Sequence, residues 1–265
     1  MIKADLHMHS SVSDGSDSVQ ELIAKAVQKG LDAIAVTDHD TLSHLNRIPQ
    51  TSPIKVLGGI EISAIDKQTK IKAHVLGYGI RDIGMVEAFV APILLRRHEN
   101  SLRQIKLLGQ NGLRIDTDLL HKADGRYIYK QHIMEYLVAT SQVMDMFGHF
   151  YQTVFKHGGY CDFDIDYVSV QEAVDVLHMA GGKAVLAHPG QQRNFYLLER
   201  LSFDGVEYNH MANSPGDKSV IMACIEKSKA PLFLTGGSDY HGRYEDVPVD
   251  IGDYVSCESG VLSVC

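Results

Sequence analysis

The stretch Asp5-Leu6-His7-Met8-His9-Ser10 closes the first predicted strand of the chain, which covers residues 2–7. Because successive side chains of a strand point to opposite faces, His7 and His9 project to the same side. Histidine is the commonest metal ligand, and two imidazoles on one side of a strand end can chelate a single ion. Asp14 follows in a turn-like segment beside Gly15. The start of the chain therefore combines a strand with a candidate metal site.

Strands and helices alternate on both sides of a purely helical region. The capping boxes that begin at Ser18 and Ser169 mark two helix starts. Seven strands are predicted, at residues 2–7, 31–37, 55–62, 71–78, 183–187, 205–208 and 231–235. Between them, helices are predicted at residues 86–111, 131–139 and 141–156. Strands separated by helices predict an α/β protein with a parallel sheet, and at this length a barrel is the expected closure. The helical region is expected to be an insert.

Histidines and carboxylates recur within or just after the predicted strands. Beyond the first strand they are His39, Glu61, His74, His188, Glu207, Asp239 and His241. In a barrel of parallel strands these ends converge on one face, where active sites are built. Carboxylates buried together without a cation would repel one another and lose their hydration. The pattern therefore favours a metal centre over a set of ordinary core residues.

Composition excludes several other classes of protein. The chain has 265 residues and a net charge of −8, which argues against a protein that coats duplex nucleic acid. No apolar run approaches the roughly 18 residues of a membrane helix, and the N-terminus does not resemble a signal peptide. The four cysteines form no Cys-x-x-Cys pair, which fits reduced thiols. We expect a cytoplasmic protein with no obligate protein partner.

Taken together, the motifs resemble the PHP family, named after polymerase and histidinol phosphatase. The resemblance rests on Asp5 to Ser10 with Asp14-Gly15, Thr37 to Asp40, Gly59 to Ser63, His74, Ala187 to Pro189 and Gly237 to Gly242. It implies a distorted (β/α)7 TIM-like barrel with an all-helical insert over the active face. The barrel would take residues 1–84 and 166–265, and the insert residues 85–165. The nearest branch is that of small bacterial phosphoesterases acting on nucleoside 3′,5′-bisphosphates and short oligonucleotides.

The same resemblance implies a centre of three divalent transition-metal ions, manganese, iron or zinc. One ion would be held by His7, His9, Glu61 and Asp239. The second would be held by Glu61, His74 and His188, and the third by Asp14, His39 and His241. Glu61, His188 and Asp239 are expected to be catalytic, in a hydrolysis of phosphate esters by a metal-activated water.

Substrate contacts are expected from four residues, Lys130, His132, Arg193 and His210. Relatives often read Gly-Arg-Pro-His where this chain reads Tyr129-Lys130-Gln131-His132, so a lysine replaces the arginine. Eight Lys and Arg residues against four acids in residues 92–130 form either a solvated helix surface or a basic rim that attracts a phosphorylated substrate.

Three alternatives remain open at this point. A histidinol-phosphate phosphatase is another branch of the same family, although the Ser-Asp-Gly and Thr-Asp-His-Asp-Thr sequences favour the first branch. An amidohydrolase also carries His-x-His on its first strand, but Asp14 and the Asp239-x-His241 pair disfavour it. A non-catalytic metal-binding PHP module would be expected to have lost some of its ligands.

Overall fold

The computed structural model describes residues 2–228 and 230–264. Its sheet contains the seven predicted strands in the order β1-β2-β3-β4-β6-β7-β8. Their bounds are β1 Ala4–Asp5, β2 Ala33–Val36, β3 Lys55–Ile65, β4 Lys72–Tyr78, β6 Lys183–Leu186, β7 Gly205–Asn209 and β8 Phe233–Gly236. A two-residue strand that was not predicted, β5 (Val168–Ser169), pairs with β3. The α/β barrel-like fold expected from the sequence is confirmed.

The chain that continues β1 runs beside the chain that continues β8. The Leu6 N–H donates to the Gly236 carbonyl at 3.1 Å, and the Asp239 N–H donates to the His7 carbonyl at 2.8 Å. A Cβ at residue 237 would lie 2.3 Å from the His7 Cβ, so only glycine permits this approach. The contact brings the first and last strands together and nearly closes the barrel.

The sheet is not entirely parallel, and the expectation that it would be is wrong. β4 is antiparallel to both of its neighbours, β3 and β6. Only residues 66–71 connect β3 to β4, and Lys70 there has a φ of 60°. A parallel crossover needs about a dozen residues or more, so this connection can form only a hairpin.

Helices lie around the sheet, and α9 (Glu258–Val264) packs against the inner side of the barrel. Ser18 and Ser169 cap α1 (Val19–Gln28) and α5 (Val170–Met179), which confirms both predicted capping boxes. The remaining helices near the barrel are α6 (Pro189–Gln192), α7 (Leu197–Arg200), α8 (Pro215–Lys227), α9 (Glu258–Val264) and the 3₁₀ turns η1 (Ser43–Arg47) and η2 (Gly242–Tyr244). Val261 of α9 packs with Ala4, Leu76 and Val185 inside the barrel. α9 was not predicted.

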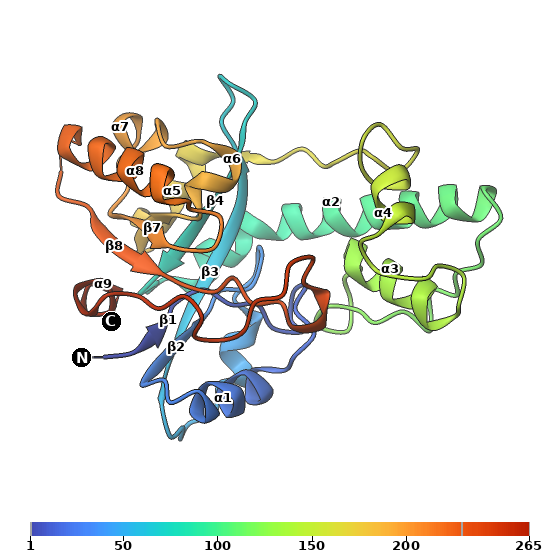
Figure 1. Ribbon diagram of the computed structural model, residues 1–265, viewed down its shortest axis with the longest axis horizontal. Helices are drawn as coiled ribbons and strands as arrows, with labels where there is room; N and C mark the ends of the chain where they lie inside the picture. The colour runs from blue at the N-terminus through green and yellow to red at the C-terminus, as the bar shows by residue number, and fades with distance from the viewer. Residues whose placement is uncertain (1, 229, 265) are drawn as a thin grey trace.

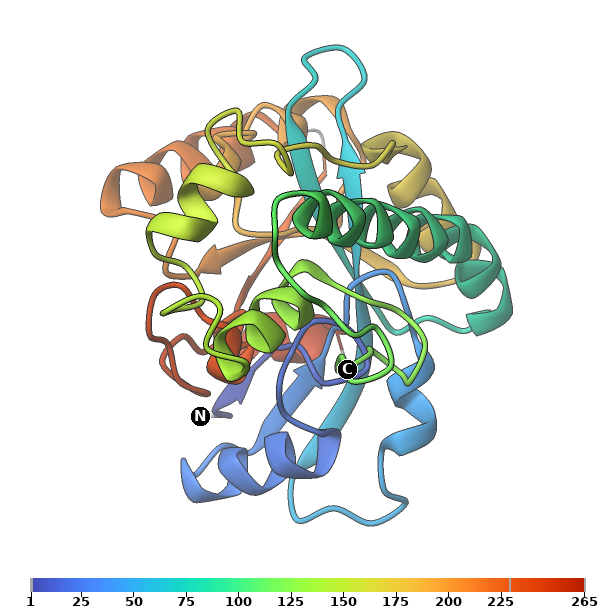
Figure 2. The same cartoon turned by 90° about the vertical axis from the view of Figure 1, so that its right-hand side faces the viewer.

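The helical region projects from the barrel on the long helix α2 (Ile83–Gln110), with α3 (Lys130–Ala139) and α4 (His149–Val154) along its far half (Figure 1). These helices have a core of their own, which includes Leu108, Ile133 and Phe155. Viewed from that side, they lie in front of the strands (Figure 2). The position fits a cover over one face of the barrel. The boundaries at residues 85 and 165 stay a prediction.

The prediction of a helix at residues 141–156 is wrong for the first half of that range. Ser141, with a φ of 56°, follows the end of α3, and helical structure resumes only at His149. The Asp145 carboxylate accepts a hydrogen bond from the Gly148 N–H and holds a turn there instead. Within the residues that the structure describes, no helix is both long and apolar enough to span a bilayer.

Candidate metal centre

The strand ends bring all nine predicted metal ligands together. His7 and His9 follow β1, His39 follows β2, Glu61 and His74 lie on β3 and β4, and His188 follows β6. Asp239 and His241 follow β8. Their ligand atoms fall into groups within 4.8 Å of one another, among them His7-His9-Glu61-Asp239 and His9-Asp14-His39-His241. The first group is the set that the resemblance implied for one ion. The second contains the predicted third set together with His9.

The Glu61 carboxylate lies at the middle of the centre. Its two oxygens face different imidazoles: Oε1 lies 2.8 Å from His74 Nδ1 and 2.9 Å from His188 Nε2, while Oε2 lies 3.0 Å from His9 Nε2, 3.1 Å from His7 Nε2 and 3.3 Å from His39 Nδ1. A carboxylate placed in this way can contribute one oxygen to each of two ligand groups. The geometry therefore fits the bridging position expected for Glu61.

Asp14 reaches the centre from the loop after β1. Its Oδ1 lies 3.5 Å from His241 Nε2 and 3.8 Å from His9 Nδ1. Gln131 of α3 donates to its other oxygen, Oδ2, at 3.0 Å. The helical region thus supplies a hydrogen bond to a ligand of the barrel, and it leaves Asp14 Oδ1 free to face the imidazoles.

Several buried ligand atoms have no hydrogen-bond partner, which tests whether cations fit this cluster. The orphaned atoms are His9 Nδ1, Asp14 Oδ1, His39 Nδ1, Glu61 Oε2 and Asp239 Oδ1. Buried polar atoms are rarely left unpaired, because each one costs free energy of desolvation. Nitrogen and oxygen donors that converge in this way are the ligands that divalent transition metals take. The residues therefore fit bound metal ions.

Electrostatics within the cluster keeps its carboxylates ionised. Burial raises the pKa of the Glu61 carboxyl, but its interactions with His7 and with the other imidazoles that face it outweigh burial and hold that pKa well below its ordinary value. Asp239 behaves in the same way: burial opposes ionisation, and His7 holds its pKa well below the ordinary value. Carboxylates that stay charged while fully buried are ready to bind cations.

Two ligands have backbone conformations that are rare for residues other than glycine. His188 has a φ of 23° and Asp239 a φ of 58°. Such conformations cost roughly 1–3 kcal/mol each and cluster at functional sites. At His188 the strained N–H donates to Glu207 Oε2 at 2.9 Å, so a buried acceptor helps to hold it.

Glu207 is the functional residue that sequence reasoning left unassigned. It is fully buried on β7, and its Oε1 lies 3.0 Å from His7 Nδ1. A ligand imidazole usually donates its second N–H to a carboxylate, which fixes the tautomer and the direction of the metal-facing nitrogen. Glu207 does this for His7, whose Nε2 then points to Glu61. The only signal in the sequence was its place at a strand end.

The helical region also braces the loop that carries His39. Arg97 of α2 donates through Nη2 to Asp40 Oδ2 and to Ser63 Oγ, both at 2.8 Å. The Tyr129 hydroxyl donates to the His39 carbonyl at 3.3 Å. Arg97 is therefore paired rather than part of a free basic rim.

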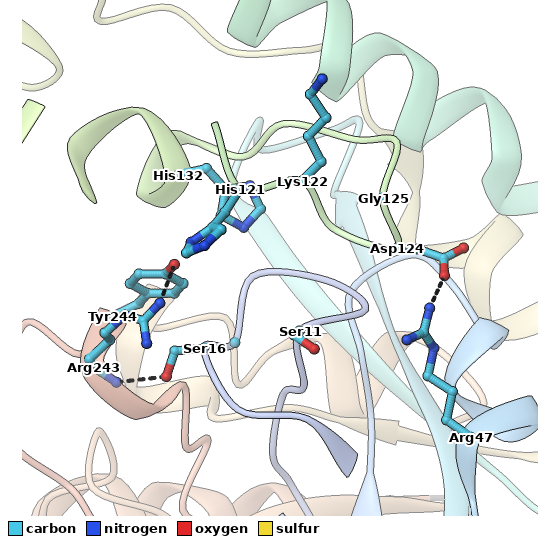
Figure 3. Close-up of a pocket in the computed structure, with 11 residues that line it drawn as sticks. Ser11, Ser16, Arg47, His121, Lys122, Asp124, Gly125, His132, Arg243 and Tyr244 are labelled. Carbon is cyan, nitrogen blue, oxygen red and sulfur yellow. Dashed lines mark hydrogen bonds and ion pairs between the residues drawn. The ribbon is translucent and has the colours of Figure 1, made fainter. Parts of the chain in front are cut away.

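The two substrate contacts predicted in α3 line different cavities. Lys130 lines a cavity of about 150 Å³ together with Asp14, Arg97 and Tyr151. His132 lines another, of about 310 Å³, where Figure 3 shows it beside His121 and Tyr244. Its Nδ1 accepts the Tyr129 N–H at 3.1 Å, so this imidazole caps the start of α3. Burial lowers the pKa of His132 to about 4, which makes it a neutral ring.

The other two predicted substrate contacts, His210 and Arg193, also lie in different places. His210 is buried next to the centre, with Nε2 3.7 Å from Asp239 Oδ2. Arg193 ends α6 with its side chain 74% exposed and its Nη1 3.6 Å from Asp217 Oδ1. Arg193 is therefore not part of the metal cluster.

The family model of the PHP domain matches residues 5–184 of this chain. The chain belongs to the PHP family. The matched residues include six of the nine predicted ligands, and the fold brings His188, Asp239 and His241 to them from beyond the match. The resemblance read from the sequence is thereby confirmed.

Relatives and solved structures agree with this membership in the PHP family. The chain is 38% identical to a phosphoribosyl 1,2-cyclic phosphate 1,2-diphosphodiesterase of Eggerthella lenta, over 92% of this chain and 96% of that one. It is 28% identical to a 3′,5′-nucleoside bisphosphate phosphatase of Chromobacterium violaceum, over 94% and 93% of the two chains. A crystal structure from Bifidobacterium adolescentis, assigned as a metal-dependent phosphoesterase, superposes with a TM-score of 0.87 at 25% identity, covering 98% of this chain and 94% of that one. This PHP protein is a metal-dependent phosphoesterase, a hydrolase of phosphate esters.

Proposed function

We propose that the nine ligands hold three divalent transition-metal ions and that the enzyme acts on a small phosphorylated pentose whose phosphate is a cyclic diester. The donor set of imidazoles and carboxylates without sulfur suits manganese, iron or zinc. Bound ions of this kind polarise a phosphoryl oxygen and lower the pKa of a coordinated water.

The residues of the chain then have separate tasks. Glu61 joins two ligand groups and fixes their spacing, since both of its oxygens are engaged. His188 and Asp239 present their side chains just after β6 and β8, both from backbone with positive φ, and Glu207 accepts a hydrogen bond from the His188 N–H. Together they orient the reacting phosphate relative to the water that attacks it, a positioning effect that contributes a large part of such catalysis.

The observation that carries the substrate assignment is the cavity of Lys130 and Arg97 beside Asp14. Its volume, about 150 Å³, is well below the 300–1,000 Å³ typical of pockets that enclose a whole drug-sized ligand. A group of the size of a phosphate with part of a pentose suits such a volume. The similarity to the Eggerthella lenta enzyme over nearly the full length of both chains supports the same class of substrate.

A nucleoside 3′,5′-bisphosphate is the second candidate, and the walls of the same cavity favour it. Tyr151, Phe163 and Tyr167 line the cavity, and aromatic rings are the surfaces on which nucleobases stack. The Chromobacterium violaceum relative supports this alternative.

Phosphate release from a panel of substrates tests the proposal. The panel contains ribose 1,2-cyclic phosphate 5-phosphate, adenosine 3′,5′-bisphosphate, a short oligonucleotide and histidinol phosphate, each with enzyme loaded separately with Mn²⁺, Fe²⁺ or Zn²⁺. We expect the highest kcat/KM with the cyclic pentose phosphate. A higher value with adenosine 3′,5′-bisphosphate would select the second candidate, and a preference for histidinol phosphate would reject both.

Replacing Lys130 tests whether the cavity binds a phosphate. Burial, together with Lys156 nearby, lowers the pKa of Lys130 to about 8. The ammonium is thus charged below that pH and neutral above it. A hydrogen bond from a charged donor is worth about 1.5–3 kcal/mol, so Lys130→Met should lower kcat/KM about tenfold to a hundredfold at neutral pH, without loss of metal.

The advantage of the wild type over Lys130→Met should shrink as the pH rises through about 8, because the wild-type lysine then loses its charge. Lys130→Arg is the matched control, since a guanidinium stays charged and should keep the advantage at higher pH. A ratio between wild type and Lys130→Met that does not change with pH would show that the charge of Lys130 does not contact the substrate.

A further inference from the structure

A second cavity also borders the metal centre and shares Gln131 with the cavity that Lys130 lines. Its volume is about 360 Å³, and Gln131, Asp239 and His241 form its boundary with the centre. The rest of its lining consists of Gln191, His210, Met211, Ala212, Tyr244, Glu245, Asp246 and Val247. Gln131 lines both cavities, and predicted ligands line each of them: Asp14 the smaller, Asp239 and His241 the larger.

The two cavities differ in charge. The smaller one is lined by Lys130 and by Arg97, which is paired with Asp40, and also by the acids Asp14 and Asp164. The larger one is lined by no Lys or Arg among the described residues, and it has Glu245 and Asp246 at its rim and the apolar side chains of Met211 and Val247 in its wall. Carboxylates repel a phosphate, and apolar walls favour an uncharged organic group. The larger cavity therefore suits an uncharged part of the substrate.

His210 lies where this cavity meets the metal centre. One of its two ring nitrogens, Nε2, is not hydrogen-bonded to another residue that the structure describes. The other, Nδ1, accepts the Ala212 N–H at 3.0 Å, so Nε2 is the ring nitrogen that can donate a hydrogen bond. Nε2 is buried and has no hydrogen-bond partner among the residues that the structure describes. Its nearest acidic atom, Asp239 Oδ2, is 3.7 Å away, which is beyond hydrogen-bond distance. The side chain as a whole is only 3% exposed.

We propose that the larger cavity receives the uncharged part of the substrate next to the scissile bond, and that His210 Nε2–H donates a hydrogen bond to the ester oxygen that leaves the phosphorus. This assignment rests on the proposed function and adds the orientation of the substrate. As the P–O bond breaks, negative charge grows on the leaving oxygen, and a donor already in place stabilises that charge more than the ground state. The His210 imidazole keeps its proton throughout, and the alkoxide takes its proton from solvent.

The competing role is that of a positioning residue for Asp239. A small rotation would bring His210 Nε2 within hydrogen-bond distance of Asp239 Oδ2, and the imidazole would then only orient a metal ligand. The two roles differ in one measurable property. A donor to the leaving oxygen matters most for alkyl alcohols, which are poor leaving groups. A residue that orients Asp239 affects all esters alike and also affects metal binding.

His210→Phe removes the donor and keeps a planar ring, and His210→Gln is the matched control because its amide retains an N–H. The substrates are p-nitrophenyl phosphate, whose leaving group needs no donor, and the alkyl phosphate that the wild type hydrolyses fastest in the panel above. We expect His210→Phe to lower kcat/KM for the alkyl ester at least about tenfold more than for the aryl ester, with unchanged bound metal. His210→Gln should recover part of the loss.

An equal loss on both esters, or a loss of bound metal, would overturn the assignment in favour of the positioning role. A wild type that hydrolyses no phosphate ester in the panel would instead overturn the proposed function, and this assignment with it.

Filling the cavity gives an independent measurement. Ala212→Leu adds volume to the lining while its N–H can still bond His210. It should raise the KM of both esters and leave the inhibition constant of inorganic phosphate unchanged, because phosphate has no uncharged organic part. A parallel rise of both constants would show that the cavity does not hold this part of the substrate.

Discussion

Glu61→Ala is expected to lose metal from two ligand groups at once and to lower kcat/KM by at least about 10²-fold. Both oxygens of this fully buried carboxylate face imidazoles, with His74 and His188 on one side and His7 and His9 on the other. Asp14 and Asp239 face the imidazoles of predicted ligands with Oδ1 alone, at 3.5 Å from His241 Nε2 and 3.1 Å from His9 Nε2 respectively. Removing the Glu61 carboxylate takes away the negative charge between these groups, and with it the Lewis acidity that the reaction requires.

Metal content by elemental analysis and kcat/KM on the best substrate measure this effect. Glu61→Gln is the matched variant, because it keeps the size of the side chain and removes the charge. Glu199→Ala, at an exposed carboxylate remote from the centre, is the negative control. If Glu61→Ala keeps full metal content and turnover close to that of the wild type, the bridging assignment is incorrect.

Removal of all metal by a chelator should abolish hydrolysis and also lower the Tm by at least about 8 °C. An ion present at a thousand times its dissociation constant adds about 4 kcal/mol to the stability of the native state. For a chain of this size, 1 kcal/mol corresponds to about 2–4 °C. The apoprotein keeps Asp14, Glu61 and Asp239 buried with orphaned oxygens, which is the physical source of the loss.

Differential scanning calorimetry before and after chelation, with back-titration of Mn²⁺, Fe²⁺ or Zn²⁺, checks this expectation. Recovery of the Tm and of activity should require more than one ion per chain, and three at saturation. A fully active, thermally restored protein with a single ion would reject the three-ion proposal. The Glu61→Gln protein, which lacks the central charge, should recover less of the Tm at the same ion concentration.

Local sequence was sufficient to predict most of the elements. The capping boxes at Ser18 and Ser169 hydrogen-bond as expected, because a cap is a contact between residues three positions apart. The helix predicted at residues 141–156 was wrong in its first half because turn-forming contacts around Asp145 competed with helix propensity. α9 and β5 were missed because they are short and depend on what they pack or pair against.

The sequence by itself determined the ligand types and their places at strand ends, since alternation along a strand is a local property that puts His7 and His9 on one side. Only the tertiary structure decided the rest. It paired β4 with β6 in antiparallel direction, placed Glu207 behind His7 and brought Gln131 and Arg97 from the helical region to Asp14 and Asp40. It also directed Lys130 and His132 into different cavities, although they are two residues apart. These outcomes depend on contacts between residues far apart in the chain, and such contacts leave no periodic pattern in the sequence.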